Sequence, residues 1–289
     1  MTASPPAQAP LIRRRLVDTR FGQIHCRVTG PAGHAQDSNA PALILFHINQ
    51  QSSALGIELL EALAPGVHAV AMDYPGCGMS DHIPFQPSIA DYADCGAEVM
   101  QALGFSRYTA MGEATGAAAA AEMSARHPAA VQAAVLVNCP IYKDNKQAHD
   151  VHRPLKDTLR PADSSGFPMT RTLEFMREKD PTHAPMNPDQ SWMDRINVAQ
   201  LETGRDRWQA LDALNAYDIK AGLEAIPCPT LLMMGEHFHY TSLLEQYTSR
   251  LRHLTEARVI QGARFCMVWE KAEELAGHVR PFLAQLRSA

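Results

Sequence analysis

The chain has 289 residues, of which 46% are hydrophobic, and it carries a formal net charge of −5 at pH 7. This length is sufficient for one large α/β domain with a substantial core and an inserted subdomain. The mild acidity argues against a nucleic-acid partner, because no basic block occurs beyond Arg13–Arg15. No apolar run approaches the length of a membrane span and no secretory signal follows Met1, so we expect a cytoplasmic protein without membrane contacts.

The six cysteines are scattered and include no Cys-x-x-Cys pair, which indicates neither a zinc cage nor a disulfide framework. We therefore expect no metal and no cofactor. The expected partner is a small-molecule ligand or substrate. The sequence does not specify the oligomeric state, and a homodimer is one option.

In chain order, residues 1–13 are rich in proline and alanine, and we expect them to form a disordered arm. Two strands are predicted over 16–19 and 23–29. The continuous apolar runs over 42–46 and 68–72 are typical of strands buried on both faces. A helix fits over 53–64 between these runs, and Ser88 is suited to cap the next helix, whose apolar residues share one stripe.

Further strands are predicted over 108–111, 134–138, 230–234 and 258–260, and a C-terminal helix follows them. Strands that alternate with helices in this way favour an α/β fold with a parallel, doubly wound sheet. Residues 140–225 break the alternation, because they are polar and proline-rich and then turn helical over 191–217. We expect them to form a helical lid inserted between two parts of the core, 14–139 and 226–289.

The turn Met111–Gly116 reads Met-Gly-Glu-Ala-Thr-Gly and places Gly112 and Gly116 four positions apart. This spacing matches Gly-x-Ser-x-Gly, a strained strand-to-helix turn that exposes its central side chain above the sheet. The central residue here is Ala114, which has no nucleophilic atom. The turn therefore predicts the fold more clearly than it predicts the reaction.

Five segments in order resemble the α/β-hydrolase superfamily, and the resemblance covers nearly the whole chain from about residue 14. They are the strand that ends at His47, the loop Asp73–Ser80, the elbow at 112–116, Leu232–Glu236 followed by His237 and Phe238, and Gly262–Phe265 followed by Cys266–Glu270. The lid is similar to that of the branch with epoxide hydrolases, haloalkane dehalogenases and C–C bond hydrolases. The resemblance implies a mostly parallel, eight-stranded sheet flanked by helices.

The resemblance also implies positions for a nucleophile, an acid and a base. Ala114 stands at the nucleophile position, Phe238 at the acid position after the seventh strand, and Phe265 at the base position. An engineered Ser→Ala substitution would explain Ala114 alone, but it would not explain two phenylalanines. We therefore predict a protein without the triad, in which these three apolar side chains line the pocket.

Two backbone donors do not depend on side-chain identity, and we expect the amides of Ile48 and Thr115 to form an oxyanion hole. The polar residues near the same sheet edge are candidates for acid–base or binding roles. The catalytic candidates are His47, Glu113 and His239, and the other candidate pocket residues are Asn49, Gln50, Cys139 and His237. Each also has a structural interpretation, since His47 is commonly a hydrogen-bonded structural residue in the family.

Four functions are compatible with these residues. The first is a cofactor-free, non-hydrolytic lyase, isomerase or cyclase that acts on a small carbonyl-containing metabolite through an apolar pocket and an oxyanion hole. The second is a non-catalytic small-molecule binder, and the third is a pseudoenzyme scaffold. The fourth is a hydrolase with non-standard catalytic residues. An open pocket would favour the first two functions, and a pocket filled by Phe238 and Phe265 would leave the scaffold.

Overall fold

The computed structural model describes residues 12–29, 40–64, 66–141 and 172–286. Most of the predicted arm 1–13 and residues 142–171 of the predicted lid lie outside the described residues. Among the described residues, no helix is both long enough and apolar enough to cross a membrane.

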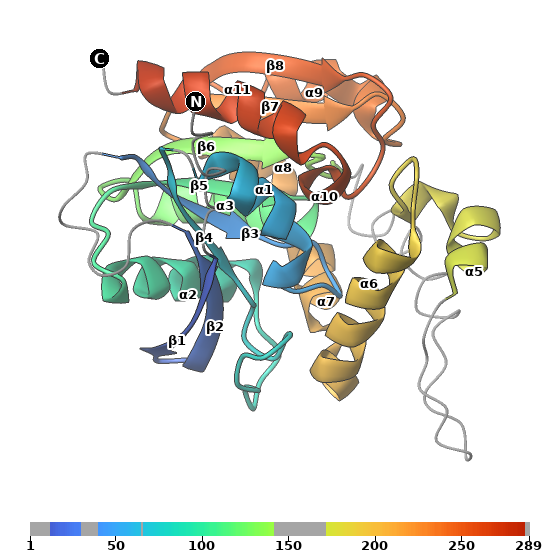
Figure 1. The fold of residues 1–289 in the computed structure, drawn as a ribbon. Coiled ribbons are helices and arrows are strands. Elements are labelled where there is room, and N and C mark those ends of the chain that lie inside the picture. The colour runs from blue at the N-terminus through green and yellow to red at the C-terminus, as the bar shows by residue number, and fades with distance from the viewer. Residues whose placement is uncertain (1–11, 30–39, 65, 142–171, 287–289) are drawn as a thin grey trace, which may run out of the picture.

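Eight strands form one sheet in the order β1-β2-β4-β3-β5-β6-β7-β8 (Figure 1). The strands are β1 Arg13–Thr19, β2 Gly22–Val28, β3 Ala42–Phe46, β4 His68–Met72, β5 Tyr108–Glu113, β6 Val131–Val137, β7 Thr230–Gly235 and β8 Leu254–Ile260. The β1–β2 and β2–β4 pairs are antiparallel, and the remaining pairs are parallel. The predicted mostly parallel sheet of eight strands is thus confirmed.

Helices cover both faces of this sheet (Figure 1). The helices are α1 Ile57–Leu63, α2 Ile89–Ala102, α3 Thr115–Arg126, α5 Leu173–Glu178, α6 Gln190–Thr203, α7 Gln209–Ala216, α8 Ile219–Glu224, α9 Leu244–Thr248, α10 Met267–Glu270 and α11 Ala272–Gln285. Four of them, α5 to α8, lie between β6 and β7, within the predicted lid. Ser88 caps α2 through a reciprocal pair of hydrogen bonds with Asp91, as its sequence position predicts.

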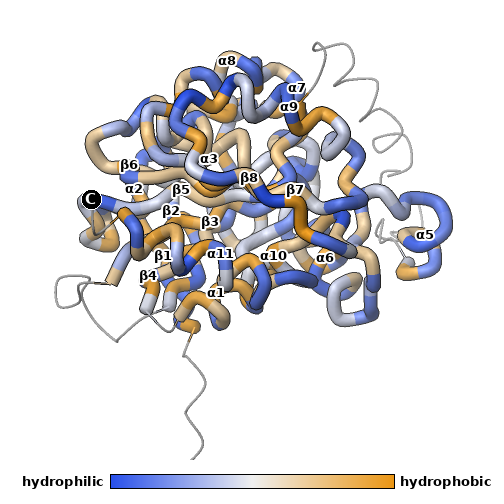
Figure 2. Tube along the Cα trace, turned by 90° about the horizontal axis from the view of Figure 1, so that it is seen from above, coloured by the Kyte–Doolittle hydropathy of each residue, from blue (hydrophilic) through white to orange (hydrophobic). Residues whose placement is uncertain are grey.

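The core is divided by the sheet into two layers, because successive side chains of a strand point to opposite faces. In β3, Ile44 and Phe46 belong to the apolar cluster that includes α2 and α3, whereas Leu43 and Leu45 belong to the cluster that includes α1 and α11. Figure 2 shows hydrophobic residues along the strands and the inner helix faces and hydrophilic residues in the turn beyond α5. This packing fixes the sheet edge at which the site is built.

Several strands start earlier than the apolar runs predict, among them β6, which begins at Val131 rather than at residue 134, and the two outermost strands of the sheet. β8 begins at Leu254 rather than at residue 258, and β1 begins at Arg13 rather than at residue 16. Both strands lie at an edge of the sheet, where one face is exposed to solvent and polar residues are tolerated. The apolar pattern used for the prediction therefore covers only part of each strand.

Candidate functional site

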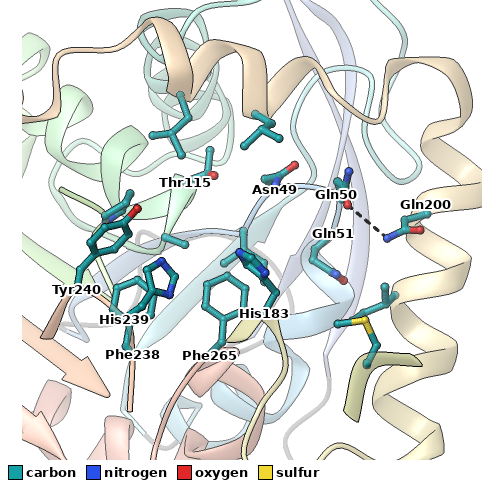
Figure 3. A pocket seen from close by; sticks show the side chains of 17 residues that line it. Asn49, Gln50, Gln51, Thr115, His183, Gln200, Phe238, His239, Tyr240 and Phe265 are labelled. Carbon is teal, nitrogen blue, oxygen red and sulfur yellow. Dashed lines mark hydrogen bonds between the residues drawn. The ribbon is translucent and has the colours of Figure 1, made fainter. Parts of the chain in front are cut away.

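A pocket opens at the carboxyl edge of the sheet, where β3 and β5 lie side by side. The connection after β3 runs to β4 on one side, and the connection after β5 runs to β6 on the other. Ligands bind in open α/β sheets at such a reversal of strand order. The pocket contains about 680 Å³ free of protein atoms, including its open mouth, and the centre of a water molecule can occupy about 70 Å³ of it (Figure 3).

The turn between β5 and α3 forms one wall of the pocket. Ala114 adopts φ 52° and ψ −113°, a conformation that residues other than glycine rarely adopt. A Cβ atom at Gly112 would meet the backbone of Gly116, and one at Gly116 would meet the backbone of Phe46. The strained turn predicted from the glycine spacing is therefore present, with Ala114 at its centre.

The two backbone donors predicted for an oxyanion hole flank this turn. Ile48 follows the end of β3, Thr115 begins α3, and both residues line the pocket. The N–H of Thr115 lies in the first helical turn, where amides have no partner within the helix and the helix dipole favours negative charge. The two amides therefore stay candidates for binding a carbonyl oxygen.

The opposite wall is aromatic. Phe238 and Phe265 line the pocket together with Ala114, and their rings lie 6.1 Å apart at an interplanar angle of 17°. Tyr240 extends this wall, with its ring 5.5 Å from that of Phe238. The two phenylalanines line the pocket without filling it. The pocket is therefore not collapsed, and a collapsed pocket was the feature that would have favoured a scaffold.

A histidine–aspartate pair from the lid reaches the same wall, and the sequence analysis missed it. His183 lines the pocket, its Nδ1 lies 2.7 Å from Oδ1 of Asp180, and its ring lies 5.8 Å from the ring of Phe265 in an edge-on arrangement (Figure 3). Residues 181–183 form a 3₁₀ turn that Pro181 begins. Because such a turn has three residues per revolution, it aligns positions 180 and 183. The Asp-Pro-x-His sequence was the available signal.

The segment after His183 is clamped to the loop that carries Phe265. The guanidinium of Arg264 donates to the carbonyl oxygens of Ala184 and Pro185, at 3.1 and 2.9 Å. The carboxylate of Glu270 accepts from the backbone amides of residues 186 and 187, at 2.8 and 2.7 Å. Both contacts belong to residues near Phe265 in the sequence, so the segment 264–270, which includes α10, holds the aromatic wall and the lid histidine together.

The two histidines on either side of Phe238 occupy different environments. His239 lines the pocket, with its ring 4.5 Å from Phe238 and 6.0 Å from His183. The side chain of His237 is 50% exposed outside the pocket, where Nε2 lies 3.6 Å from a carboxylate oxygen of Glu236. Of the two predicted residues, only His239 belongs to the described lining of the pocket. His239 stays a candidate, and His237 does not belong to the pocket wall.

His47 lies behind the wall, and both of its ring nitrogens are occupied. Nδ1 is 2.7 Å from the carbonyl oxygen of Ile48, and Nε2 accepts from the amide of Tyr74 at 3.2 Å. Burial lowers the pKa of His47 below its ordinary value, so the neutral ring is favoured. These contacts give His47 the structural role and correct its choice as a catalytic candidate.

Comparison with known proteins agrees with this geometry. Residues 41–272 match the family model described as the alpha/beta hydrolase fold. The chain belongs to this family. The elbow at Ala114 and the pocket above it thus occupy the place where α/β-hydrolases carry out their chemistry.

The similar proteins are named as hydrolases. A protein of Agrobacterium fabrum named as the carbamate hydrolase RutD is 27% identical over 222 residues, which cover 75% of this chain and 80% of that protein. A proline iminopeptidase of Heyndrickxia coagulans is 22% identical over 270 residues, which cover 86% and 92% of the two chains. The crystal structure of the carboxylesterase CesB from Bacillus subtilis superposes with a TM-score of 0.73 at 21% identity, covering 96% of this chain and 92% of that one.

Glu113 precedes the elbow centre of this α/β-hydrolase-fold protein and is turned away from the pocket. It is fully buried, and its carboxylate accepts from the amides of Met267 and Val268 and from the side chain of Asn138 at 2.9 to 3.1 Å. Burial raises the pKa of Glu113, whereas these hydrogen bonds act in the opposite direction. The contacts describe a structural brace and correct the choice of Glu113 as a catalytic candidate.

Cys139 is also a core residue rather than a pocket residue. Its side chain is fully buried, and its Sγ lies 3.8 Å from the carbonyl oxygen of Pro140, which does line the pocket. Burial raises the pKa of the Cys139 thiol far above its ordinary value. A thiol held neutral in this way is a poor nucleophile.

Carboxamide side chains form the remaining wall of the pocket. Asn49 and Gln50, both predicted, line it together with Gln51 from the same loop and Gln200 from α6, which the sequence analysis did not select (Figure 3). Gln50 has φ 61°, in the region that favours glycine. The row of amides therefore includes a residue whose backbone conformation is strained.

The described residues include no group of three or more His, Cys, Asp or Glu side chains that could hold a metal ion. Apart from the histidines, the side chains that line the pocket in the described part of the chain carry no ionisable acid or base other than the phenol of Tyr240. The chemistry available to the described site therefore consists of imidazoles, carboxamides, the hydroxyl groups of Thr115 and Tyr240, backbone amides and aromatic rings.

Proposed function

We propose that this α/β-hydrolase-fold protein is a cofactor-free enzyme without the Ser-His-Asp triad that moves protons on a small, uncharged carbonyl compound. The observation that carries the proposal is the His183–Asp180 pair in the pocket wall. The pair lies beside Phe265, at the position where the family resemblance implies the base. Ala114 supplies no nucleophile, so the reaction proceeds without a covalent enzyme intermediate.

The Asp180 carboxylate can only accept a hydrogen bond, so it holds the His183 ring with the proton on Nδ1. Nε2 is then the basic nitrogen. It removes a proton from the carbon next to the substrate carbonyl. The C–H electron pair becomes the C=C bond of an enolate, and the amides of Ile48 and Thr115 stabilise its oxygen.

The imidazolium then returns the proton to the substrate. Return to another carbon gives an isomerase, and return to a departing group gives a lyase. Both reactions are redox-neutral and consume no further reactant. His239, 6.0 Å from His183 between ring centroids, is placed to act as the second proton carrier. A base positioned in this manner contributes about 10²- to 10⁴-fold to the rate.

A hydrolase that uses water as the nucleophile is the second candidate. Two observations favour it: the similar proteins are named as hydrolases, and the small side chain of Ala114 leaves space above the elbow. In this reaction His183 would deprotonate a water molecule that attacks the carbonyl carbon. The carbamate hydrolase among the relatives fits a substrate in which a carbonyl is bonded to nitrogen.

The test uses phenylacetone, an uncharged ketone with an aromatic ring and acidic hydrogens beside the carbonyl. In deuterium oxide, ¹H NMR is expected to show faster loss of these hydrogens with the protein than in buffer. His183→Ala is expected to lower this rate by about 10²-fold or more. Asp180→Asn, which leaves the imidazole in place, is expected to lower it less and to change its pH dependence.

His237→Ala is the matched control, because His237 is an exposed histidine outside the pocket. It should leave the exchange rate unchanged. Exchange at the rate of buffer, or exchange that survives His183→Ala, contradicts the proposal. Turnover of p-nitrophenyl acetate that His183→Ala abolishes, without any exchange of phenylacetone, would favour the hydrolase.

A further inference from the structure

The carboxamide wall contains buried polar atoms that have no partner among the described residues. Oδ1 of Asn49, Nε2 of Gln50 and Oε1 of Gln200 are inaccessible to solvent and form no hydrogen bond within the described part of the chain. The side chains of Gln50 and Gln200 belong to residues that are each only 3% exposed. The hydrogen bond between these two, from Nε2 of Gln200 to Oε1 of Gln50, is long at 3.5 Å.

An unpaired buried polar group destabilises the folded state, because it gives up its hydrogen bonds to water and gains none in return. Three such groups in one wall are a large penalty for a folded protein, whose net stability is a small difference between large terms. The backbone adds to it, because Gln50 holds a left-handed conformation without being glycine. Strain and unpaired groups that converge on one pocket indicate a site that a ligand completes.

Two different elements present these amides to the same space. Asn49 and Gln50 follow β3 in the loop beside the proposed oxyanion hole, whereas Gln200 projects from α6 of the lid. Ile196 and Gln200 are four residues apart, so they share one face of α6, and both line the pocket. Figure 3 shows Gln50 and Gln200 facing each other across the end of the pocket that is remote from Tyr240.

The three unpaired polar atoms indicate which chemical group a ligand needs in order to bind them. Asn49 and Gln200 offer acceptors and Gln50 offers a donor, so the complementary group has two N–H donors and one carbonyl acceptor. A carboxamide or ureido group has this set. A carboxylate has no donor, and the described lining contains no lysine or arginine to neutralise it. An ester offers acceptors alone.

We infer that the pocket binds a substrate bearing a neutral carboxamide or ureido group, which the Asn49–Gln50–Gln200 cluster recognises while the aromatic wall holds the apolar part. This inference rests on the proposed function in so far as the bound compound is a substrate. Binding does not require the proton transfer, so binding and catalysis can be tested separately.

Three probes that share a phenylmethyl group test it by isothermal titration calorimetry: phenylacetamide, methyl phenylacetate and phenylacetate. The wild-type protein is expected to bind the amide at least tenfold more tightly than the ester or the acid. Gln200→Met retains the length and the helix propensity of the side chain but removes its amide. It is expected to lower the affinity for phenylacetamide about tenfold and to leave the affinity for the ester unchanged.

Stability distinguishes recognition from a structural role. If the amide of Gln200 serves to bind a ligand, Gln200→Met removes an unpaired buried group from the free protein. The urea midpoint of the free variant should then equal or exceed that of the wild type. Asn49→Ala, at a half-buried loop position, gives a second loss of amide selectivity. Gln101→Met, an exposed change on α2, is the control that should alter neither binding nor stability.

Equal affinities for amide and ester, or no binding of phenylacetamide, overturn the inference. So does a Gln200→Met variant that loses stability and weakens both probes equally, because the amides would then be structural. Amide-selective binding without any exchange of phenylacetone would support this inference and contradict the proposed function. Exchange of phenylacetone by a protein that does not bind phenylacetamide would support the proposed function and contradict this inference.

Discussion

Replacement of Glu113 tests whether its carboxylate has a structural or a catalytic role. In the folded protein its two oxygens accept from three donors, which belong to Asn138, Met267 and Val268. Glu113→Ala leaves the amides of Met267 and Val268 buried without a partner, whereas Asn138 keeps its hydrogen bond to the carbonyl oxygen of Arg264. Because each of the two unpaired amides costs about 1–3 kcal/mol, we expect a loss of roughly 2–6 kcal/mol in the free energy of unfolding.

Such a loss is a large part of the stability of an ordinary domain, about 5–15 kcal/mol. Glu113→Gln is therefore the more informative variant. It keeps one oxygen as an acceptor and places an amide N–H₂ group against one remaining donor, which costs roughly 1–3 kcal/mol. It also removes the carboxylate whose charged form burial disfavours, which offsets part of this loss.

The pH dependence has a defined sign. Burial raises the pKa of Glu113 in the folded protein, so the folded state retains a proton at pH values where the unfolded chain has released it. Stability therefore falls as the pH rises from the ordinary pKa of glutamate to the raised one. Glu113→Gln has no proton to release, so its stability relative to wild type should improve across this interval.

Urea unfolding followed by circular dichroism measures these differences, with Glu273→Gln on the exposed face of α11 as the control. The control should stay within about 0.5 kcal/mol of wild type. A Glu113→Ala protein with an unchanged urea midpoint and no exchange activity would refute the structural role and restore the catalytic one.

Three further predictions concern the core and the elbow. Burial acts to raise the pKa of Asp73, but hydrogen bonds that include one from His25 lower it to about 2. The contribution of Asp73 to stability should therefore be lost as the pH falls from about 4 to 2. Acid titration should show this loss in the wild-type protein and not in Asp73→Asn. All six cysteines are free and buried, so Ellman's reagent should find no reactive thiol in the native protein and six in denaturant; any fast-reacting thiol contradicts this. Ala114→Ser alone should not create turnover of p-nitrophenyl acetate, whereas Ala114→Ser with Phe238→Asp and Phe265→His should, because only the triple variant places an acid and a base at the positions that the family resemblance implies for activating a nucleophile at residue 114.

The sequence predicts the elements of this protein whose burial leaves a local pattern in the chain. Strands such as β3 and β4 are buried on both faces, so their residues are apolar without interruption, and this pattern can be recognised without knowing which elements pack against them. The elbow is also predictable, because two close backbone approaches exclude any side chain at Gly112 and Gly116. Both kinds of signal are local, and both were found.

The candidate site was predicted less well, because hydrogen-bond partners come from distant segments. Glu113 has the chemistry of an acid, yet the amides that occupy it lie more than 150 residues away in the sequence. His183 was missed for the opposite reason. It lies in a proline-rich segment without periodicity, where only the 3₁₀ turn aligns it with Asp180 and only the fold brings it to Phe265.

The clamp around Phe265 gives this arrangement its chemical sense. An imidazole carried by a lid is useful as a base only if it is held within a fraction of an ångström of one position. Arg264 and Glu270 bind the backbone directly after His183, and the segment 264–270 that carries them is itself tied to the elbow through Glu113. The base position, the elbow and the lid histidine thus form one connected framework. In that framework the rings of His183 and Phe265 pack edge to face, so in the proposed reaction these two residues together take the place of the single histidine that the family resemblance implies.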